Sequence, residues 1–285
     1  MFPAPIPACI LARISQGATA VAHSIEQVRN IALTGHNGAG KTTLAEAIIF
    51  NTRQLTRLGR VEDGTTISDY DSEEIERKIS LRSSLLTGEV GGYHFDVIDI
   101  PGYADFLPQA QSALRVADGS VVVIDAVSGV DVGTERVWRF AAESSLPRLI
   151  FLNKLDRADV DVEGTMEQVR ERFGREAVTL QLPVGAGEGF HQVIDLVAQK
   201  LLTYADGKAS EADIPAELTD EVASLRQHLM EAVAETDEAL MEAYFGEGEL
   251  DAEQMSNGLR QAVLTQQIVP VLYGDAFNNI GVDQL

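Results

Sequence analysis

The stretch GHNGAGKT (35–42) is the part of the sequence that best predicts the fold. It fits the pattern G-x-x-x-x-G-K-[ST] and lies between an apolar run, IALTG (31–35), and a helix-like run, TTLAEAIIF (42–50). Its glycines leave consecutive backbone amides free to wrap a phosphate at the positive end of a helix. We therefore predict a phosphate-binding loop in which Lys41 bridges the β- and γ-phosphates and the Thr42 hydroxyl binds Mg²⁺. The residues expected around the phosphates are His36, Asn37, Gly38, Ala39, Gly40, Lys41, Thr42 and Thr43.

The rest of the chain alternates between short apolar runs and helical stretches. Buried strands are predicted at YHFDVIDI (93–100), SVVVIDAV (120–127), RLIFLN (148–153) and IVPVLYG (268–274). This order favours an α/β fold of the P-loop NTPase type, a mostly parallel, doubly wound sheet with helices on both faces and ligands beyond the carboxyl ends of its strands. The Gly-Gly turn within TGEVGGYHFDVIDIPG (87–102) predicts one hairpin, and therefore one antiparallel edge strand.

Two short motifs follow later strands and indicate which nucleotide base is bound. The first is Asp99-Ile100-Pro101-Gly102, where Asp99 can hold a water ligand of Mg²⁺ and the Gly102 amide can sense a γ-phosphate. The second is Asn153-Lys154-Leu155-Asp156, where Asp156 can accept hydrogen bonds from two donors that guanine has and adenine lacks. We expect Asn153 to support this loop and touch the N7 edge of the base, with the stem of Lys154 along the ring.

The phosphate loop alone does not distinguish the classes of nucleotide-binding protein. The string GHNGAGKTTL resembles the loop of ABC-transporter ATPases as much as that of a GTPase. An ABC ATPase also needs an LSGGQ-like signature farther on, and the sequence has no such string. The two motifs above are the ones that a GTPase requires, in the required order, so they favour GTP over ATP.

Charge and composition exclude other classes. The formal charge is −22, from 44 acidic and 22 basic side chains, so the whole chain repels a phosphate backbone and is not a generic nucleic-acid binder. Its single cysteine, Cys9, excludes internal disulfides and suits a reducing cytoplasm. No apolar run approaches the roughly 18 to 20 residues that span a bilayer, which excludes a membrane-embedded protein.

The chain divides into three parts by composition. Residues 1–24 hold one basic and no acidic side chain; we expect a disordered extension or an over-long start there, and a targeting peptide is the alternative. Residues 25–157 and 262–285 form the predicted GTP-binding domain, and 158–261 a separate inserted subdomain. From Arg157 to Arg260 there are 23 acidic against 8 basic side chains. This surplus is either a solvated surface or a face for a basic protein partner.

Four segments resemble elongation factor G and its close paralogues. GRVEDGTTISDYDSEEIERKISL (59–81), DIPGYADF (99–106), NKLDR (153–157) and LQLPVGAGEGFHQVIDLV (180–197) are similar to that family's first switch, second switch, base-specificity loop and inserted α+β subdomain. The resemblance covers about residues 25 to 285. It implies a translational GTPase that binds GTP or GDP with Mg²⁺ and acts, as a cytoplasmic monomer, on the ribosome. It also implies further domains, so we expect this chain to be a fragment or a truncated reading frame of a longer factor.

The resemblance adds residues to the predicted site. It implies a closing loop at Gly274-Asp275-Ala276-Phe277, in which the Ala276 amide meets the oxygen of the base and Asp275 replaces the family's serine. Ser80 keeps a hydroxyl for Mg²⁺ where the family has threonine. The predicted metal ligands are thus Thr42, Ser80 and, through water, Asp99. Asp275, Ala276 and Phe277 join the residues predicted to bind the nucleotide.

Three further departures from the family concern catalysis. Tyr103 stands where the family has a histidine that orients the attacking water. A phenol, with a pKa of about 10, can still hydrogen-bond but is bulkier and stays uncharged near neutrality. Asn37 and Gly38 replace an apolar and an acidic residue of the family's loop. Tyr103, Gly102 and Lys41 are the candidate catalytic residues.

With these departures, the sequence resembles the second elongation-factor-G-like paralogue. Two hypotheses about GTP hydrolysis follow. In the first, a slow or ribosome-stimulated GTPase uses Tyr103 or a backbone group to place the water. In the second, a switch senses GTP without useful turnover. A ribosomal-protection-type factor or a stress-linked ribosome binder is compatible with either. We favour the first hypothesis.

Overall fold

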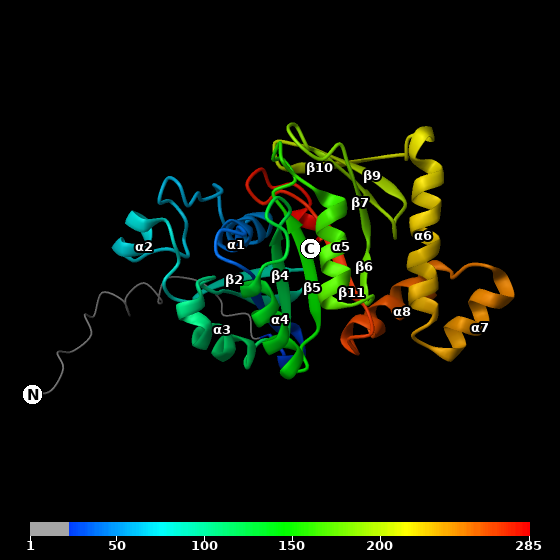
Figure 1. Ribbon diagram of the computed structural model, residues 1–285, viewed down its shortest axis with the longest axis horizontal. Helices are drawn as coiled ribbons and strands as arrows, with labels where there is room; N and C mark the ends of the chain where they lie inside the picture. Colours follow the sequence, from blue (N-terminus) through cyan, green and yellow to red (C-terminus); the bar gives the residue numbers. More distant parts are fainter. Residues whose placement is uncertain (1–22) are drawn as a thin grey trace, which may run out of the picture.

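The structure is a computed structural model that describes residues 23–285, and Figure 1 shows it as a ribbon. Residues 1–22 of the predicted extension lie outside the described part. In Figure 1, a central sheet is flanked by helices, and the short helix α2 (Ser72–Arg77) and the helix α7 (Glu238–Glu247) lie at opposite ends of the long axis. Within the described residues, no helix is both long and apolar enough to cross a bilayer.

A seven-stranded sheet with the order β2-β3-β1-β4-β5-β11-β6 forms the centre of the molecule. Its strands are β1 (Val28–Thr34), β2 (Ser84–Val90), β3 (Tyr93–Asp99), β4 (Gly119–Asp125), β5 (Arg148–Asn153), β6 (Ala177–Thr179) and β11 (Val269–Tyr273). Every neighbouring pair is parallel except β2 and β3. The turn of that hairpin has φ of 58° at Gly91 and 86° at Gly92, a left-handed conformation that favours glycine. The predicted antiparallel edge strand is confirmed.

Helices cover both faces of this sheet, which confirms the predicted fold class. They are α1 (Lys41–Asn51), α3 (Leu107–Leu114), α4 (Val132–Glu143) and α5 (Val162–Phe173). Side chains alternate along each strand, so Leu33 and Val123 pack with α1 while Val122 and Ile124 pack with α5. Ala32 points to the side of α3 and α4. The 3₁₀ turn η5 (Val282–Gln284) lies against α1 and adds Val282 to the core on that face.

A second, antiparallel sheet with the order β10-β9-β8-β7 forms the inserted α+β subdomain. Its strands are β7 (Gln181–Val184), β8 (Gln192–Asp195), β9 (Lys200–Ala205) and β10 (Lys208–Ala212). The helices α6 (Thr219–Ala234) and α8 (Ala252–Leu264) and the helix α7 complete it, around a core that includes Ile194, Leu229 and Met255. The predicted limits, 158–261, stay a prediction, since α5 and β6 fall inside them but pack with the seven-stranded sheet.

Short 3₁₀ turns connect several of these elements. Those outside the C-terminus are η2 (Ile25–Gln27), η3 (Ala104–Phe106) and η4 (Ala216–Leu218). The turn η3 follows the Asp99–Gly102 motif after Tyr103 and leads into α3. The connection between α1 and β2, which contains α2, includes the predicted first switch at residues 59–81.

Candidate functional site

A cavity of about 240 Å³ opens where β1, β3, β5 and β11 end. This is the edge at which a doubly wound sheet places its ligand. The predicted residues that line it are Asn37, Gly38, Gly40, Lys41, Thr42, Thr43, Ser80, Gly102, Asn153, Lys154, Asp156, Asp275 and Phe277. The structure thus brings together parts of every predicted motif. Five further predicted residues are not among the lining residues: His36, Ala39, Asp99, Tyr103 and Ala276.

Glycines at two positions allow the loops around this cavity to meet. Gly40, with φ of 93°, precedes α1, and a Cβ atom there would lie 2.3 Å from Nδ2 of Asn153. A Cβ atom on Gly102 would lie 2.5 Å from both the Asn37 amide nitrogen and the Lys41 Nζ. A side chain at Gly102 would therefore collide with the backbone of the phosphate loop, whereas one at Gly40 would displace the Asn153 side chain and strain a left-handed backbone. The backbone of the Asp99–Gly102 motif is consequently in close contact with the phosphate loop.

Lys41 is a buried cation at the floor of the cavity. The residue is only 7% exposed. Its Nζ donates hydrogen bonds to the carbonyl oxygens of Gly35, at 3.2 Å, and His36, at 2.8 Å. Burial lowers the pKa of Lys41 to about 8, against the opposing charges of Asp99 and Asp131. Such a group gains from an anionic partner, because ionised hydrogen bonds to phosphate are stronger than those to a carbonyl.

Side-chain oxygens from three segments gather beside Lys41. Thr42 Oγ1 donates to Asp99 Oδ2 at 2.6 Å and lies 3.0 Å from Ser80 Oγ. The other oxygen of Asp99, Oδ1, is buried and has no hydrogen-bond partner among the described residues. Burial raises the pKa of Asp99 to about 6, although the Thr42 hydrogen bond and the charge of Lys41 lower it. Hydroxyl and carboxylate oxygens are ligands that Mg²⁺ prefers, and a divalent cation would offset the cost of this buried carboxylate. The residues present fit Mg²⁺.

Asp69 is a fourth member of this oxygen cluster that the sequence analysis missed. It is buried, lines the cavity, and accepts a hydrogen bond from Ser80 Oγ at 2.9 Å. Burial is also the main cause of its raised pKa. The segment that carries Asp69 is tied to helix α1 by a hydrogen bond from the Ile67 amide to the Glu46 carboxylate, and it is closed on itself by the Leu81 and Arg82 amides, which donate to the Glu74 carboxylate of α2. No motif or periodic spacing marks this contact, so only the folded chain reveals it.

Asn153 joins the phosphate loop to the closing loop. Its Nδ2 donates to the Ala39 carbonyl at 2.8 Å, and its Oδ1 accepts from the Ala276 amide at 2.9 Å. Lys154 is held in the same way, since its Nζ donates to the Gly38 carbonyl at 2.6 Å and to Asp125 at 2.7 Å. Asn153 and Lys154 thus link these loops, and the predicted role of Asn153 in supporting the base-binding loop stays a prediction. Contact of the Ala276 amide or of Asn153 with a guanine base stays a prediction.

The far end of the cavity contains two neighbouring carboxylates. Asp156 and Asp275 both line it, and Asp275 is fully buried. Burial raises the pKa of Asp275, and the nearby charge of Asp156 raises it further, although the Phe277 amide donates to its carboxylate at 3.0 Å. The guanidinium carbon of Arg60 lies 3.7 Å from the centroid of the Phe277 ring, so the first switch touches the closing loop. No motif in the sequence marks Arg60 as a contact of this loop.

The side chains of Tyr103 and His36 point elsewhere. Tyr103 is 38% exposed and lines a separate small pocket with Gly35 and Arg136. The imidazole of His36 pairs with Asp131, the residue that caps α4, so this residue reaches the cavity only through the hydrogen bond between its backbone carbonyl and Lys41. A catalytic role for Tyr103 and a direct nucleotide contact by His36 stay predictions.

Comparison with known proteins agrees with this geometry. The sequence model of the family described as "Elongation factor Tu GTP binding domain" matches residues 26–285. A crystal structure of a protein from Thermus thermophilus aligns with a TM-score of 0.84 and 36% sequence identity. The alignment covers 90% of this chain and 39% of that protein, so this chain spans well under half of that protein's length.

Proposed function

Because the chain belongs to the elongation factor Tu GTP-binding domain family of translational GTPases, we propose that it is the nucleotide-binding domain of an elongation-factor-G-like factor. The family as a whole binds guanine nucleotides and hydrolyses GTP. In our proposal, this chain holds GTP or GDP with Mg²⁺ in the cavity described above and uses the γ-phosphate to order its first switch. Hydrolysis is slow, or depends on the ribosome.

The contact between Thr42, Ser80 and Asp99 carries this proposal. It joins the phosphate loop, the first switch and the Asp99–Gly102 motif within 3.0 Å at one point. Two switch segments that share a metal site with the phosphate loop can both respond to the γ-phosphate, which is the basis of the order–disorder switch in GTPases. Asp69, through its hydrogen bond to Ser80, draws the rest of the first switch to the same point.

We assign the following roles to the residues of the cavity. Thr42 and Ser80 would hold Mg²⁺ directly and Asp99 through water, and the ion would neutralise charge on the β- and γ-phosphates. Lys41 would exchange its two carbonyl partners for phosphate oxygens. The Gly102 amide would sense the γ-phosphate. The predicted phosphate-loop residues Asn37, Gly38, Ala39, Gly40 and Thr43 would surround the remaining phosphate oxygens.

Base selectivity is assigned to Asp156. A carboxylate in this position would accept two hydrogen bonds from guanine, whereas adenine would leave it facing an acceptor without partners. Asn153 and Lys154 would position the loop, consistent with their contacts to the phosphate loop. Ala276 and Phe277 would close the pocket over the base.

A second candidate, a GTP-sensing switch with little turnover, is favoured by the position of Tyr103. Its side chain lines the pocket beside Arg136 and not the cavity. In the slow-hydrolysis alternative, the phenol or a backbone group of the second switch would have to reach the attacking water after a movement of this segment. The rate with and without ribosomes distinguishes the two candidates.

The partners and the compartment belong to the same proposal. We infer a monomeric, cytoplasmic factor that acts on the ribosome, because the family acts in translation. The acidic subdomain would present its charge to solvent or to a basic protein partner. In neither case does the bulk charge favour general binding to RNA.

Hydrogen exchange tests whether the nucleotide controls the first switch. With Mg²⁺ and a non-hydrolysable GTP analogue, amides in residues 66–81 should exchange more slowly than with Mg²⁺ and GDP, because Ser80 gains its metal contact only with a γ-phosphate. Helix α6, remote from the cavity, is the internal control and should exchange equally in both states. Equal protection of residues 66–81 in the two states would remove Ser80 from the switch.

A further inference from the structure

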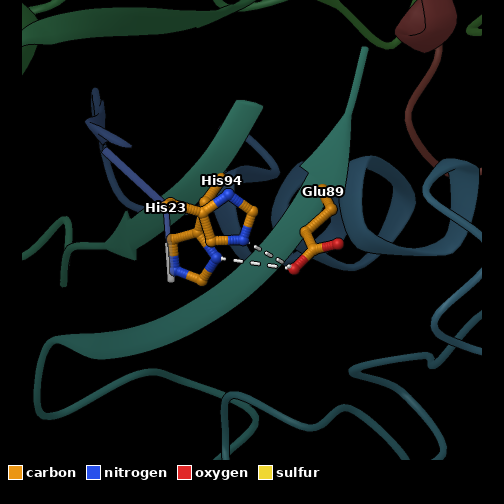
Figure 2. Close-up of side chains that lie close together, drawn as sticks. All are labelled: His23, Glu89 and His94. Carbon is orange, nitrogen blue, oxygen red and sulfur yellow. Dashed lines mark hydrogen bonds and ion pairs between the residues drawn. The ribbon is translucent and has the colours of Figure 1, made fainter. Parts of the chain in front are cut away.

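Two histidines and one glutamate meet at the turn end of the β2–β3 hairpin, away from the nucleotide cavity (Figure 2). Glu89 and His94 are directly opposite each other in the antiparallel pair. His23 reaches them from the segment before η2, and Val28 of β1 lies beside His94 in the sheet. Residues that are far apart in sequence are thus brought together by strand register.

The potential ligand atoms of these side chains lie close together. His23 Nε2 lies 3.2 Å and His94 Nδ1 3.8 Å from the same oxygen, Glu89 Oε1. One ligand atom from each residue lies within 4.8 Å of the others. Ligands about 2.1 Å from a common Zn²⁺ ion are at most about 4.2 Å apart. A small rotation of the exposed Glu89 side chain or of an imidazole would therefore bring all three atoms around one ion.

The Nδ1 atom of His94 gives an independent indication of a ligand. It is buried and has no hydrogen-bond partner among the described residues. A buried polar atom without a partner is costly, and such atoms in folded proteins usually have a specific reason. A metal ion bound at Nδ1 would supply the missing interaction.

A carboxylate near the other ring nitrogen of His94 could act as a second-layer partner of a metal site. Its other ring nitrogen, Nε2, faces Asp96 Oδ1 at 3.8 Å, and Asp96 is itself held by Thr87 Oγ1 at 2.7 Å. Metal-binding histidines commonly direct their second nitrogen to a carboxylate, which fixes the ring and makes it a better donor. Asp96 is a positioning residue in this arrangement.

We propose that His23, Glu89 and His94 form a binding site for a divalent transition-metal ion of the zinc class. Two imidazoles and one carboxylate are a donor set that zinc accepts, with water completing the coordination, whereas Mg²⁺ prefers oxygen ligands only. The ion would join the N-terminal segment to the hairpin that precedes Asp99. None of these three residues lines the nucleotide cavity. We therefore expect the ion to bind whether or not the chain holds a nucleotide.

Zinc titration of the full chain tests this site. The protein is first saturated with Mg²⁺ and GDP, so that the oxygen cluster at Asp99 is already filled, and is then titrated with Zn²⁺ by calorimetry. We expect one saturable equivalent of Zn²⁺. Asp96→Asn should weaken its binding about 10- to 100-fold, and His23→Ala, His94→Ala and Glu89→Gln should weaken it by at least as much.

Controls separate the site from general binding to this acidic chain. His228, an exposed histidine of α6, is the matched control, and His228→Ala should leave Zn²⁺ affinity unchanged. Glu89→Gln changes an exposed side chain and keeps its shape, so it tests the site even if His94→Ala folds poorly. Co²⁺ gives a second readout, a visible absorption band that Glu89→Gln should remove. Absence of a saturable site in the parent, or equal affinity in all variants, would overturn the proposal.

Discussion

Strand β3 carries two sites of different character at its two ends. At its carboxyl end, Asp99 belongs to a cluster of oxygen atoms that suits Mg²⁺. Near its start, His94 belongs to a cluster with two imidazoles that suits a transition metal. Thr42, Ser80 and Asp99 of the first cluster lie in recognisable sequence segments and could be predicted, whereas Asp69 could not. The second is formed by pairing across the hairpin and with β1, and it could not.

Among substitutions that should affect only the site at the carboxyl end of β3, Lys41→Ala is expected to have the largest effect. Truncating one partner of a buried, hydrogen-bonded charge pair costs about 2 to 5 kcal/mol, so GTP affinity should fall by about 30-fold to several thousand-fold. Zn²⁺ affinity should not change. Fluorescence titration with a labelled guanine nucleotide measures the nucleotide affinity, and calorimetry measures the Zn²⁺ affinity. Unchanged GTP affinity would mean that Lys41 keeps its carbonyl partners and does not contact phosphate.

An intermediate effect is expected from Tyr103→His, measured as single-turnover GTP hydrolysis with and without ribosomes. Positioned acid–base groups contribute about 10²- to 10⁴-fold, and we expect a gain near the lower limit, because Asn37 and Gly38 still depart from the family's loop. Tyr103→Phe is the matched control, which keeps the ring without the hydroxyl. If the parent already hydrolyses GTP as fast as a histidine-bearing factor, and Tyr103→His changes nothing, another residue positions the water.

A smaller effect is expected from Ser80→Ala. A single hydroxyl contact contributes about 0.5 to 1.5 kcal/mol, so the affinity for a GTP analogue should fall at most about tenfold. The loss should be smaller still for GDP, since Ser80 is assigned to the γ-phosphate state. Titrations of both nucleotides at fixed Mg²⁺ test this, with Ser210→Ala on β10 as control. Equal losses for both nucleotides would contradict the assignment.

The smallest effect is a pH dependence at Asp275. Burial and the charge of Asp156 raise its pKa in the folded state above the ordinary value. The stability it contributes is then fully present below the unfolded pKa and is lost as pH rises through the folded-state pKa. Asp275→Asn cannot titrate, so its free energy of unfolding should rise relative to the parent from about pH 4 upward. Urea unfolding at several pH values measures this, and parallel profiles of the two proteins would contradict it.

Most of the fold could be predicted because apolar runs mark its buried strands. The prediction 148–153 coincides with β5, and 120–127 differs from β4 by one or two residues at each end. The Gly-Gly turn predicted the hairpin. The limits of the inserted subdomain were harder to predict, because α5 and β6 continue the alternating pattern of the main sheet although they follow the Asn153–Asp156 motif.

The candidate site could be predicted only where a motif fixes the backbone. Gly40 and Lys41 lie at the cavity because the glycine-rich turn between β1 and α1 places them there, and Gly102 because its motif follows the end of β3. Side-chain directions in loops have no such rule, and so Tyr103 and His36 point away from it. Contacts made by a returning loop, such as that between Asp69 and Ser80, leave no pattern in the sequence either.

Calorimetric titration of the full chain with GTP, GDP and ATP in the presence of Mg²⁺ tests the central claim most directly. A site built to hydrogen-bond a particular group rejects an analogue that lacks it by about 10⁴-fold. We therefore predict one GTP or GDP per chain and ATP binding weaker by that order, with Asp156→Asn shifting preference toward xanthine nucleotides. Equal affinity for GTP and ATP in the parent would contradict the assignment of this cavity to guanine nucleotides.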